Sequence, residues 1–208
     1  QLRHEFHQYP ELGFQETKTK TKIAKFLRAI GLEVLEGVGV IGVLKSGLGS
    51  KTIGLRADMD ALPIQETSKH AYSSKHPGVM HACGHDGHTT MLLGAAEELA
   101  NSLDFDGTVI FIFQPNEENG LGAKAMLNEG ILSSFPISEI FALHNLPGTE
   151  TGRIITRKGL ICSSESLFEI SLKGQGGHAS MPHVGRDTIS VGSEIIQSLQ
   201  NIISNYYG

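Results

Sequence analysis

The chain has 208 residues, of which 39% are hydrophobic and 19% are charged, and its formal net charge is -5. This composition is typical of an ordinary globular protein, and the length suffices for one large domain or two small ones. The charge leaves no basic surplus, which argues against a nucleic acid partner. No apolar run approaches the roughly 20 residues of a membrane-spanning helix, so we expect no membrane association.

The only two cysteines, Cys83 and Cys162, lie far apart in the sequence and do not suggest a disulfide framework. We therefore expect a reduced, cytoplasmic protein. The first residues lack an initiator Met and resemble the middle of a helix, and the chain stops directly after an amphipathic run. We expect a fragment of a longer protein, so a missing signal peptide carries no information about location.

Helical patterns occur at three places in the first three quarters of the chain. Residues 15–30 carry apolar side chains at helical spacing and stop at Gly31. Residues 86–103 predict a second helix that Asp86 caps. Its apolar stripe is expected to consist of Met91, Leu92, Ala95, Ala96 and Leu99. A short third helix is expected over residues 123–128.

Strand patterns lie between these helices, over residues 39–47, 51–58, 107–114 and 139–145. The last two are nearly continuous apolar runs, which are typical of strands covered on both faces. Strand, helix, strand, helix and strand follow one another. This order predicts an α/β domain with a mostly parallel sheet flanked by helices.

The pattern changes after about residue 160. Residues 166–174 alternate apolar and polar side chains, as in a sheet with one exposed face. A loop over 175–187 and an amphipathic helix over 187–203 follow. We place a boundary near Cys162, so that residues 1–161 form the first domain and residues 162–208 begin a smaller α+β domain.

Side chains suited to metal binding or proton transfer follow several of the expected strands. In open α/β sheets, ligands bind at the carboxyl ends of the strands. Three strands end at or run into acidic or imidazole side chains, namely Asp58 and Asp60, Glu117 and Glu118, and His144. The segment MHACGHDGHTTML before the long helix adds His81, Cys83, His85, Asp86 and His88. We expect these four segments to meet at one edge of the sheet.

Each of these features also has a structural explanation. A cysteine among histidines is often a small buried residue, and an aspartate after a strand is usually a turn or cap residue. His81 and His88 are expected to pack or bond beneath the site. The H-x-C-x-H spacing fits no usual structural zinc site, and no second cysteine pair completes one. However, the adjacent Glu117 and Glu118 favour a metal that takes one as ligand and leaves the other as general base.

Six motifs extend this interpretation over nearly the whole chain. In order, they are HQYPELGFQE, GLRADMDALPIQE, MHACGHDGHTTMLLGAA, FIFQPNEENGLGAKAML, ALHNLPG and GQGGHASMPHVGRD. They resemble the successive motifs of the M20 metallopeptidase family. The resemblance is closest to its amidohydrolase branch, which includes hippurate hydrolases, N-acyl-amino-acid amidohydrolases and plant auxin-conjugate hydrolases. Six ordered motifs are far more specific than any one of them.

The resemblance implies a site for two divalent metal ions, Mn²⁺ or Zn²⁺, in the larger domain. The positions that match the family's metal ligands are Cys83, His85, Glu118 and His144. Glu117 matches the catalytic glutamate. Asp58 and Asp60 occupy the strand end where other branches hold a metal histidine and its orienting aspartate, and we expect them to support the ligands. His178 matches a lid-domain histidine that reaches a substrate carbonyl, often across a dimer interface.

The implied reaction is hydrolysis of the amide bond of an N-acyl amino acid, with Glu117 as the general base. The implied assembly is a homodimer formed through the lid domain. A thiolate ligand favours zinc on softness, whereas oxygen and imidazole ligands leave manganese open. One alternative is a dipeptidase of the same family. Another is a non-catalytic metal-binding protein, which the spare Glu117 disfavours because structural sites are normally closed by four protein ligands.

The sequence departs from the family pattern in two respects. The family usually has Ala where this chain has Asn116. Family members also continue well past this chain, in a segment that carries the last metal histidine. We therefore expect the 208-residue chain alone to be inactive and to bind metal weakly. An unpaired edge strand around residues 166–173 should also promote association between chains.

Overall fold

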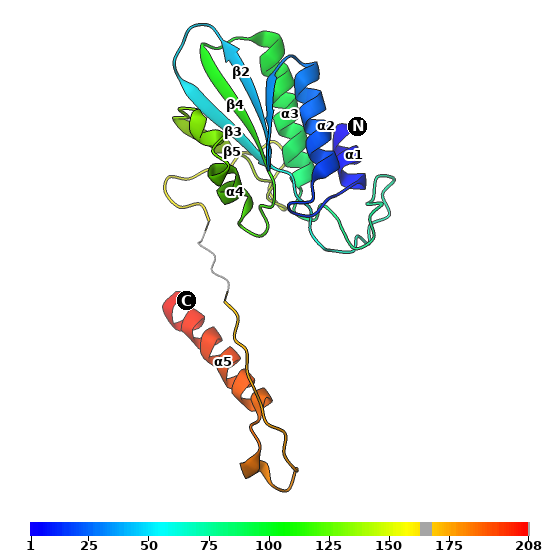
Figure 1. Ribbon diagram of the computed structural model, residues 1–208, viewed down its shortest axis with the longest axis vertical. Helices are drawn as coiled ribbons and strands as arrows, with labels where there is room; N and C mark the ends of the chain where they lie inside the picture. The colour runs from blue at the N-terminus through cyan, green and yellow to red at the C-terminus, as the bar shows by residue number, and fades with distance from the viewer. Residues whose placement is uncertain (163–167, 208) are drawn as a thin grey trace. The chain divides into compact units, whose positions relative to one another are not determined.

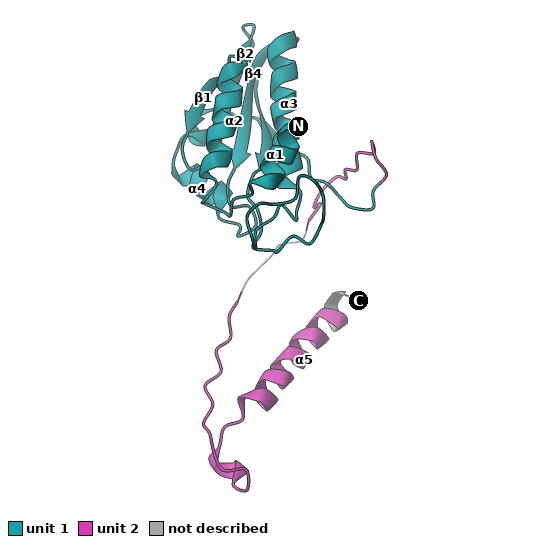
Figure 2. Ribbon diagram, turned by 90° about the vertical axis from the view of Figure 1, so that its right-hand side faces the viewer, with its two compact units in different colours: residues 1–149 teal, residues 150–208 magenta. Residues whose placement is uncertain are grey.

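The computed structural model describes residues 1–162 and 168–207. The chain divides into two compact units, residues 1–149 and residues 150–208 (Figure 2). The domain boundary expected near Cys162 borders residues 163–167, which lie outside the described residues, and it stays a prediction. Among the described residues, no helix has the length and apolar character needed to cross a membrane.

The first unit is built on a five-stranded sheet (Figure 1). Its strands are β1 (Glu33–Glu36), β2 (Val40–Ser46), β3 (Thr52–Asp58), β4 (Gly107–Gln114) and β5 (Glu139–Ala142). The spatial order is β1-β2-β4-β3-β5. β2 is antiparallel to β1 and β4, whereas β3 is parallel to β4 and β5. Four strands therefore point in one direction and β2 in the other, which confirms a mostly parallel α/β sheet.

Helices cover both faces of this sheet. They are α1 (Leu2–Gln8), α2 (Thr17–Ala29), α3 (His85–Ser102) and α4 (Gly122–Asn128). α1, α2 and α3 lie on one face, and α4 lies on the other with the short 3-10 helix Leu132–Ser134 (Figure 1). This arrangement confirms the expected flanking of the sheet by helices.

β4 is the centre of the core because its side chains alternate between the two faces. Val109, Phe111 and Phe113 pack in the cluster formed with α1, α2 and α3. Ile110 and Ile112 pack in the cluster that includes Met126 of α4. All five β4 side chains are buried, which confirms a strand covered on both faces. The strand that leads into Glu117 and Glu118 is therefore anchored in the core on both faces.

The predicted start and stripe of α3 need correction. The helix begins at His85 instead of Asp86, and its N-cap is Gly84 in the left-handed region with φ 95°. The Asp86 carboxylate is not a cap, because it accepts hydrogen bonds from Arg3 and His7 of α1. The buried face of α3 consists of His85, Asp86, His88, Thr89, Leu92, Leu93 and Ala96. Met91 is half exposed. Leu92 and Ala96 of the predicted stripe are buried and Leu99 packs against the core, so only Met91 is misassigned, while the first two turns bury polar side chains.

The strand predicted over residues 139–145 forms, but the prediction that it is covered on both faces is wrong. All four residues of β5 are exposed, and Phe141 is 52% exposed. β5 is the last strand in the spatial order and pairs only with β3. Its apolar character therefore does not reflect a covered position among the described residues.

The second unit contains a loop and a long helix. An isolated antiparallel bridge joins Gln175 to Arg186, and a 3-10 helix spans Pro182–Val184. α5 (Thr188–Tyr207) confirms the predicted helix, and the Asp187 carboxylate accepts a hydrogen bond from the Ile189 N–H at 2.9 Å. Residues 168–173 form no strand, contrary to prediction, since a ladder needs a partner strand and none occurs in the described part of this unit. Residues 166 and 167 lie outside the described residues.

Candidate metal centre

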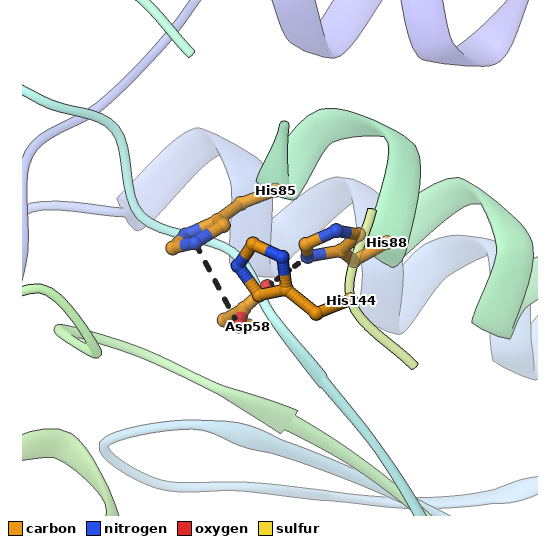
Figure 3. Close-up of side chains that lie close together, drawn as sticks. All are labelled: Asp58, His85, His88 and His144. Carbon is orange, nitrogen blue, oxygen red and sulfur yellow. Dashed lines mark hydrogen bonds and ion pairs between the residues drawn. The ribbon is translucent and has the colours of Figure 1, made fainter. Parts of the chain in front are cut away.

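The candidate site lies where the parallel strands β3, β4 and β5 end. In the register of the sheet, Asp58 at the end of β3 lies opposite Gln114 at the end of β4. Arg56 of β3 lies opposite Ala142, the last residue of β5. The chain segments after these three strands therefore emerge at the same edge. The first turn of α3 reaches this edge as well, and Figure 3 shows His85 and His88 facing Asp58 and His144 there.

His85 is the centre of the site. Its side chain is fully buried, and its Nδ1 lies 3.1 Å from Asp60 Oδ1. Since a carboxylate only accepts, Nδ1 carries a proton, and in the neutral ring, which is the form that binds a metal, Nε2 presents a lone pair. Nε2 has no hydrogen-bond partner among the described residues. It faces carboxylate oxygens of Asp58 at 3.7 Å, Glu117 at 3.8 Å and Glu118 at 3.7 Å.

Gly84 gives His85 its position. Its φ of 95° lies in the left-handed region, which only glycine adopts at little cost. A Cβ atom there would also lie 2.4 Å from Asn145 Oδ1. The glycine thus lets the chain that follows β5 pack directly against the start of α3.

A first group of possible ligands combines Cys83, His85 and Glu118. One ligand atom of each lies within 4.8 Å of the others. Glu118 Oε1 is buried without a hydrogen-bond partner, as His85 Nε2 is. Two unpaired buried atoms that can only accept are costly alone, and one cation between them would satisfy both. The site residues therefore fit a divalent metal.

A second group shares His85 and adds Asp58, His88 and His144, again within 4.8 Å of one another. His144 Nδ1 donates to the Asn145 carbonyl at 2.8 Å, so Nε2 carries the lone pair and accepts from the Cys83 thiol at 3.4 Å. The nitrogens of His88 are occupied, because Nδ1 donates to Asp58 at 2.7 Å and Nε2 accepts from the Asn145 N–H at 3.0 Å. His88 thus supports its neighbours, as the sequence suggested.

Burial and neighbouring charges shift the pKa values of three side chains in the site. Burial opposes ionisation of Asp58, but the hydrogen bond from His88 and the charges of His85 and Arg56 lower its pKa to about 2. Burial, followed by the negative charge of Glu118, raises the pKa of the Cys83 thiol to about 12. Burial also raises the pKa of Glu118. A thiolate and a second carboxylate at neutral pH thus require positive charge nearby.

The structure brings together most of the side chains expected at the site, namely Asp58, Cys83, His85, Glu117, Glu118 and His144. His178 belongs to the second unit, where its Nδ1 accepts from the Ser180 Oγ at 2.7 Å. His81 is buried, and its ring forms no hydrogen bond within the part of the chain that the structure describes. Sequence reasoning missed Asn145, which bonds His88 and packs on Gly84. Its only signal is its place directly after His144.

The family model that describes peptidase family M20/M25/M40 matches residues 54–208. The chain belongs to this family. It is 46% identical over 206 residues to hippurate hydrolase of Campylobacter jejuni, a match that covers 98% of this chain and 54% of that protein. It is 41% identical over 208 residues to N-acetylcysteine deacetylase of Bacillus subtilis, with coverages of 98% and 54%. The chain thus spans about half the length of these curated relatives.

A solved structure supports the fold and the type of site. The YXEP protein of Bacillus subtilis, a dinuclear metal binding peptidase of the M20 family, matches with a TM-score of 0.67 and 43% identity. The match covers 71% of this chain and 42% of that chain. The family, the α/β fold and a plausible metal site therefore agree.

Proposed function

We propose that this chain forms the larger part of the active site of a metal-dependent amidohydrolase that cleaves the amide bond of N-acyl amino acids. One observation carries the proposal: the unpaired Nε2 of buried His85 faces three carboxylates at 3.7–3.8 Å. The similarity to a hippurate hydrolase and an N-acetylcysteine deacetylase supports a small N-acyl amino acid as substrate.

We assign the metal ligands to Cys83, His85, Glu118 and His144, and we expect two divalent ions. Bound divalent ions would lower the pKa of a water molecule and polarise the substrate carbonyl. The Cys83 thiolate favours Zn²⁺, whereas the imidazole and carboxylate ligands also suit Mn²⁺. Elemental analysis of the purified protein distinguishes these two ions.

Glu117 is the proposed general base. Its side chain is 38% exposed, against 23% for Glu118. Its carboxylate lies 3.8 Å from His85 Nε2. A carboxylate beside the ligands that is open to solvent can take a proton from water and return it to the leaving nitrogen. Asp60 accepts from His85 Nδ1 and holds the ring so that Nε2 faces Asp58 and the glutamates.

The second unit supplies the proposed lid. We propose that His178 reaches the substrate carbonyl and stabilises the developing oxyanion, and that the protein forms a homodimer through this unit. His178→Ala should lower turnover and leave metal content unchanged. Full activity in this variant would remove His178 from the mechanism.

Both cysteines are free thiols, which supports a reduced, cytoplasmic location.

The test is an assay of the protein, and of any longer form in which this chain occurs, against hippurate, other N-acyl amino acids and dipeptides. In the longer form we expect release of the amino acid that EDTA abolishes and Zn²⁺ or Mn²⁺ restores, whereas the 208-residue chain alone should be inactive. Cleavage of dipeptides alone would favour the dipeptidase alternative. Metal binding without hydrolysis of any of these amides in the longer form would contradict the proposal.

A further inference from the structure

Glu16 is a buried carboxylate that does not serve the helix on which it sits. It is the N-cap residue of α2, but its side chain makes no capping hydrogen bond. It is only 2% exposed, and its Oε1 accepts the Asn116 N–H at 2.9 Å, from a residue 100 positions further along the chain. Burial raises the pKa of Glu16. A buried carboxylate is costly, and here its hydrogen bond reaches the loop before the glutamate pair.

Asn116, which donates this hydrogen bond, has an unusual backbone conformation. Its φ is 45°, and it directly precedes Glu117. It is 2% exposed, and its carbonyl accepts the Gly122 N–H at 3.1 Å. A Cβ atom on Gly13 would lie 2.0 Å from Asn116 Oδ1, so the Asn116 side chain is packed tightly. Asparagine tolerates the left-handed region better than most residues, but it remains less favourable there than glycine, so the surrounding contacts help to hold this conformation.

A second carboxylate holds the same loop two residues later. Asp60 Oδ2 accepts the Glu118 N–H at 3.1 Å, while Asp60 Oδ1 accepts from His85 Nδ1. The loop from Asn116 to Glu118 is thus fixed at two peptide N–H groups, by Glu16 and by Asp60. The Asp60 contact links the loop to His85. The Glu16 contact fixes the orientation of the Asn116 N–H, in the residue directly before Glu117.

We propose that Glu16 is a positioning residue for the Glu117–Glu118 pair, acting through the Asn116 N–H. This inference rests on the proposed function, because it assumes that Glu118 binds metal and Glu117 takes a proton. Without the Glu16 acceptor, Asn116 can relax from its left-handed conformation, and this turns the peptide that carries Glu117. Both carboxylates would then leave the space in front of His85 Nε2.

The alternative is that Glu16 only stabilises α2, and Glu11 provides a matched control. The Glu11 carboxylate accepts from the Lys18 N–H at 3.1 Å and from the Thr19 N–H at 2.8 Å, so it caps α2. Its side chain makes no hydrogen bond to the loop of Asn116 among the described residues. Glu11→Leu should therefore weaken α2 and leave the metal site intact.

The experiment compares Glu16→Leu, Glu16→Gln and Glu11→Leu by unfolding temperature, by Zn²⁺ affinity in a chelator competition, and by the visible spectrum of the Co²⁺-loaded protein. We expect Glu16→Leu to lose at least about tenfold in metal affinity, the scale of losses at outer supports of metal ligands. Glu16→Gln keeps an acceptor oxygen and should restore the affinity. Glu11→Leu should lower the unfolding temperature alone. If Glu16→Leu does not fold, Gly13→Ala displaces Asn116 instead and should lower the affinity.

Wild-type metal affinity and an unchanged cobalt spectrum in a folded Glu16→Leu protein would overturn the inference. So would equal losses of affinity in Glu16→Leu and Glu11→Leu. The metal readouts also separate the two proposals. Wild-type protein that binds metal but hydrolyses no amide would contradict the proposed function alone, whereas an active protein insensitive to Glu16→Leu would contradict this inference alone. In active protein, kcat should fall in Glu16→Leu more than KM rises.

Discussion

Asp58 accepts a hydrogen bond from His88 Nδ1 at 2.7 Å, while its other oxygen faces His85 Nε2 at 3.7 Å. Arg56 also donates to this second oxygen, at 2.8 Å. The hydrogen bonds from His88 and Arg56 fix the carboxylate plane, and against its burial the surrounding His and Arg groups lower the pKa of Asp58 to about 2. Asp58 is therefore ionised and oriented toward the centre of the site.

Replacing His88 should weaken metal binding although His88 is not a proposed ligand. His88→Ala removes the donor to Asp58 and the acceptor for Asn145. We expect a loss of about 10–100-fold in metal affinity. His76→Ala is a matched control, because His76 Nδ1 donates to the Pro10 carbonyl, away from the site. Equal metal affinity in both variants would show that the Asp58–His88 contact has no such role.

Cys83→Ser should lose metal and activity together, because a hydroxyl replaces a thiolate ligand poorly. Metal affinity should fall by more than about tenfold, because even residues that only support a ligand cause losses of that size when they are replaced. Cys162→Ser serves as the control for removal of a thiol and should behave as wild type. Elemental analysis measures the metal content of both. Unchanged metal content in Cys83→Ser would make Cys83 a packing residue.

Glu117→Gln and Glu118→Gln should fail in different ways. Glu117→Gln removes the proposed base while the ligands remain, so turnover should fall about 10²–10⁴-fold with metal content unchanged. Glu118→Gln replaces a proposed ligand, so metal binding itself should weaken. Steady-state kinetics and metal analysis of the two proteins test this division of roles. Equal loss of metal in both variants is the contrary result.

The pH dependence of stability should include a contribution from Glu66, which lies away from the proposed ligands. Burial opposes its ionisation, but hydrogen bonds from Ser68, Ser74 and His7 lower its pKa from 4.5 to about 2. A lowered folded-state pKa of an acid stabilises the fold above the unfolded value. This contribution should be present above pH 4.5 and lost as the pH falls toward 2.

Urea unfolding of wild type and Glu66→Gln between pH 3 and 7 measures this contribution. The difference in unfolding free energy between the two proteins should be constant near neutrality and shrink below pH 4.5. A difference that grows as the pH falls would contradict the assignment. The titration of groups that do not contact Glu66 cancels in the comparison.

Much of the fold could be predicted because its strands carry local signals. β4 is apolar on both faces and β3 runs into Asp58, so the carboxyl edge of the sheet could be located from the sequence. β1 has only four residues and gave no pattern. The burial of β5 was misjudged because an apolar run does not reveal an edge position.

The supporting contacts of the site could not be predicted, because they join residues far apart in the sequence. Glu16 meets Asn116 across 100 positions, and His88 meets Asn145 across 57. Nothing local distinguishes Glu16 from Glu11, a neighbouring glutamate that caps α2. Motifs thus indicate residues that bear chemistry, whereas the residues that orient them become visible only in three dimensions.

The most direct test of the account is the location of bound metal in crystals of the zinc-loaded protein, by anomalous diffraction at the zinc edge. We predict strong peaks at the carboxyl edge of β3, β4 and β5, adjacent to His85 Nε2 and within bonding distance of Cys83 and Glu118. Peaks elsewhere, or no peak beside His85 in fully zinc-loaded protein, would contradict the central claim that this cluster is a metal centre.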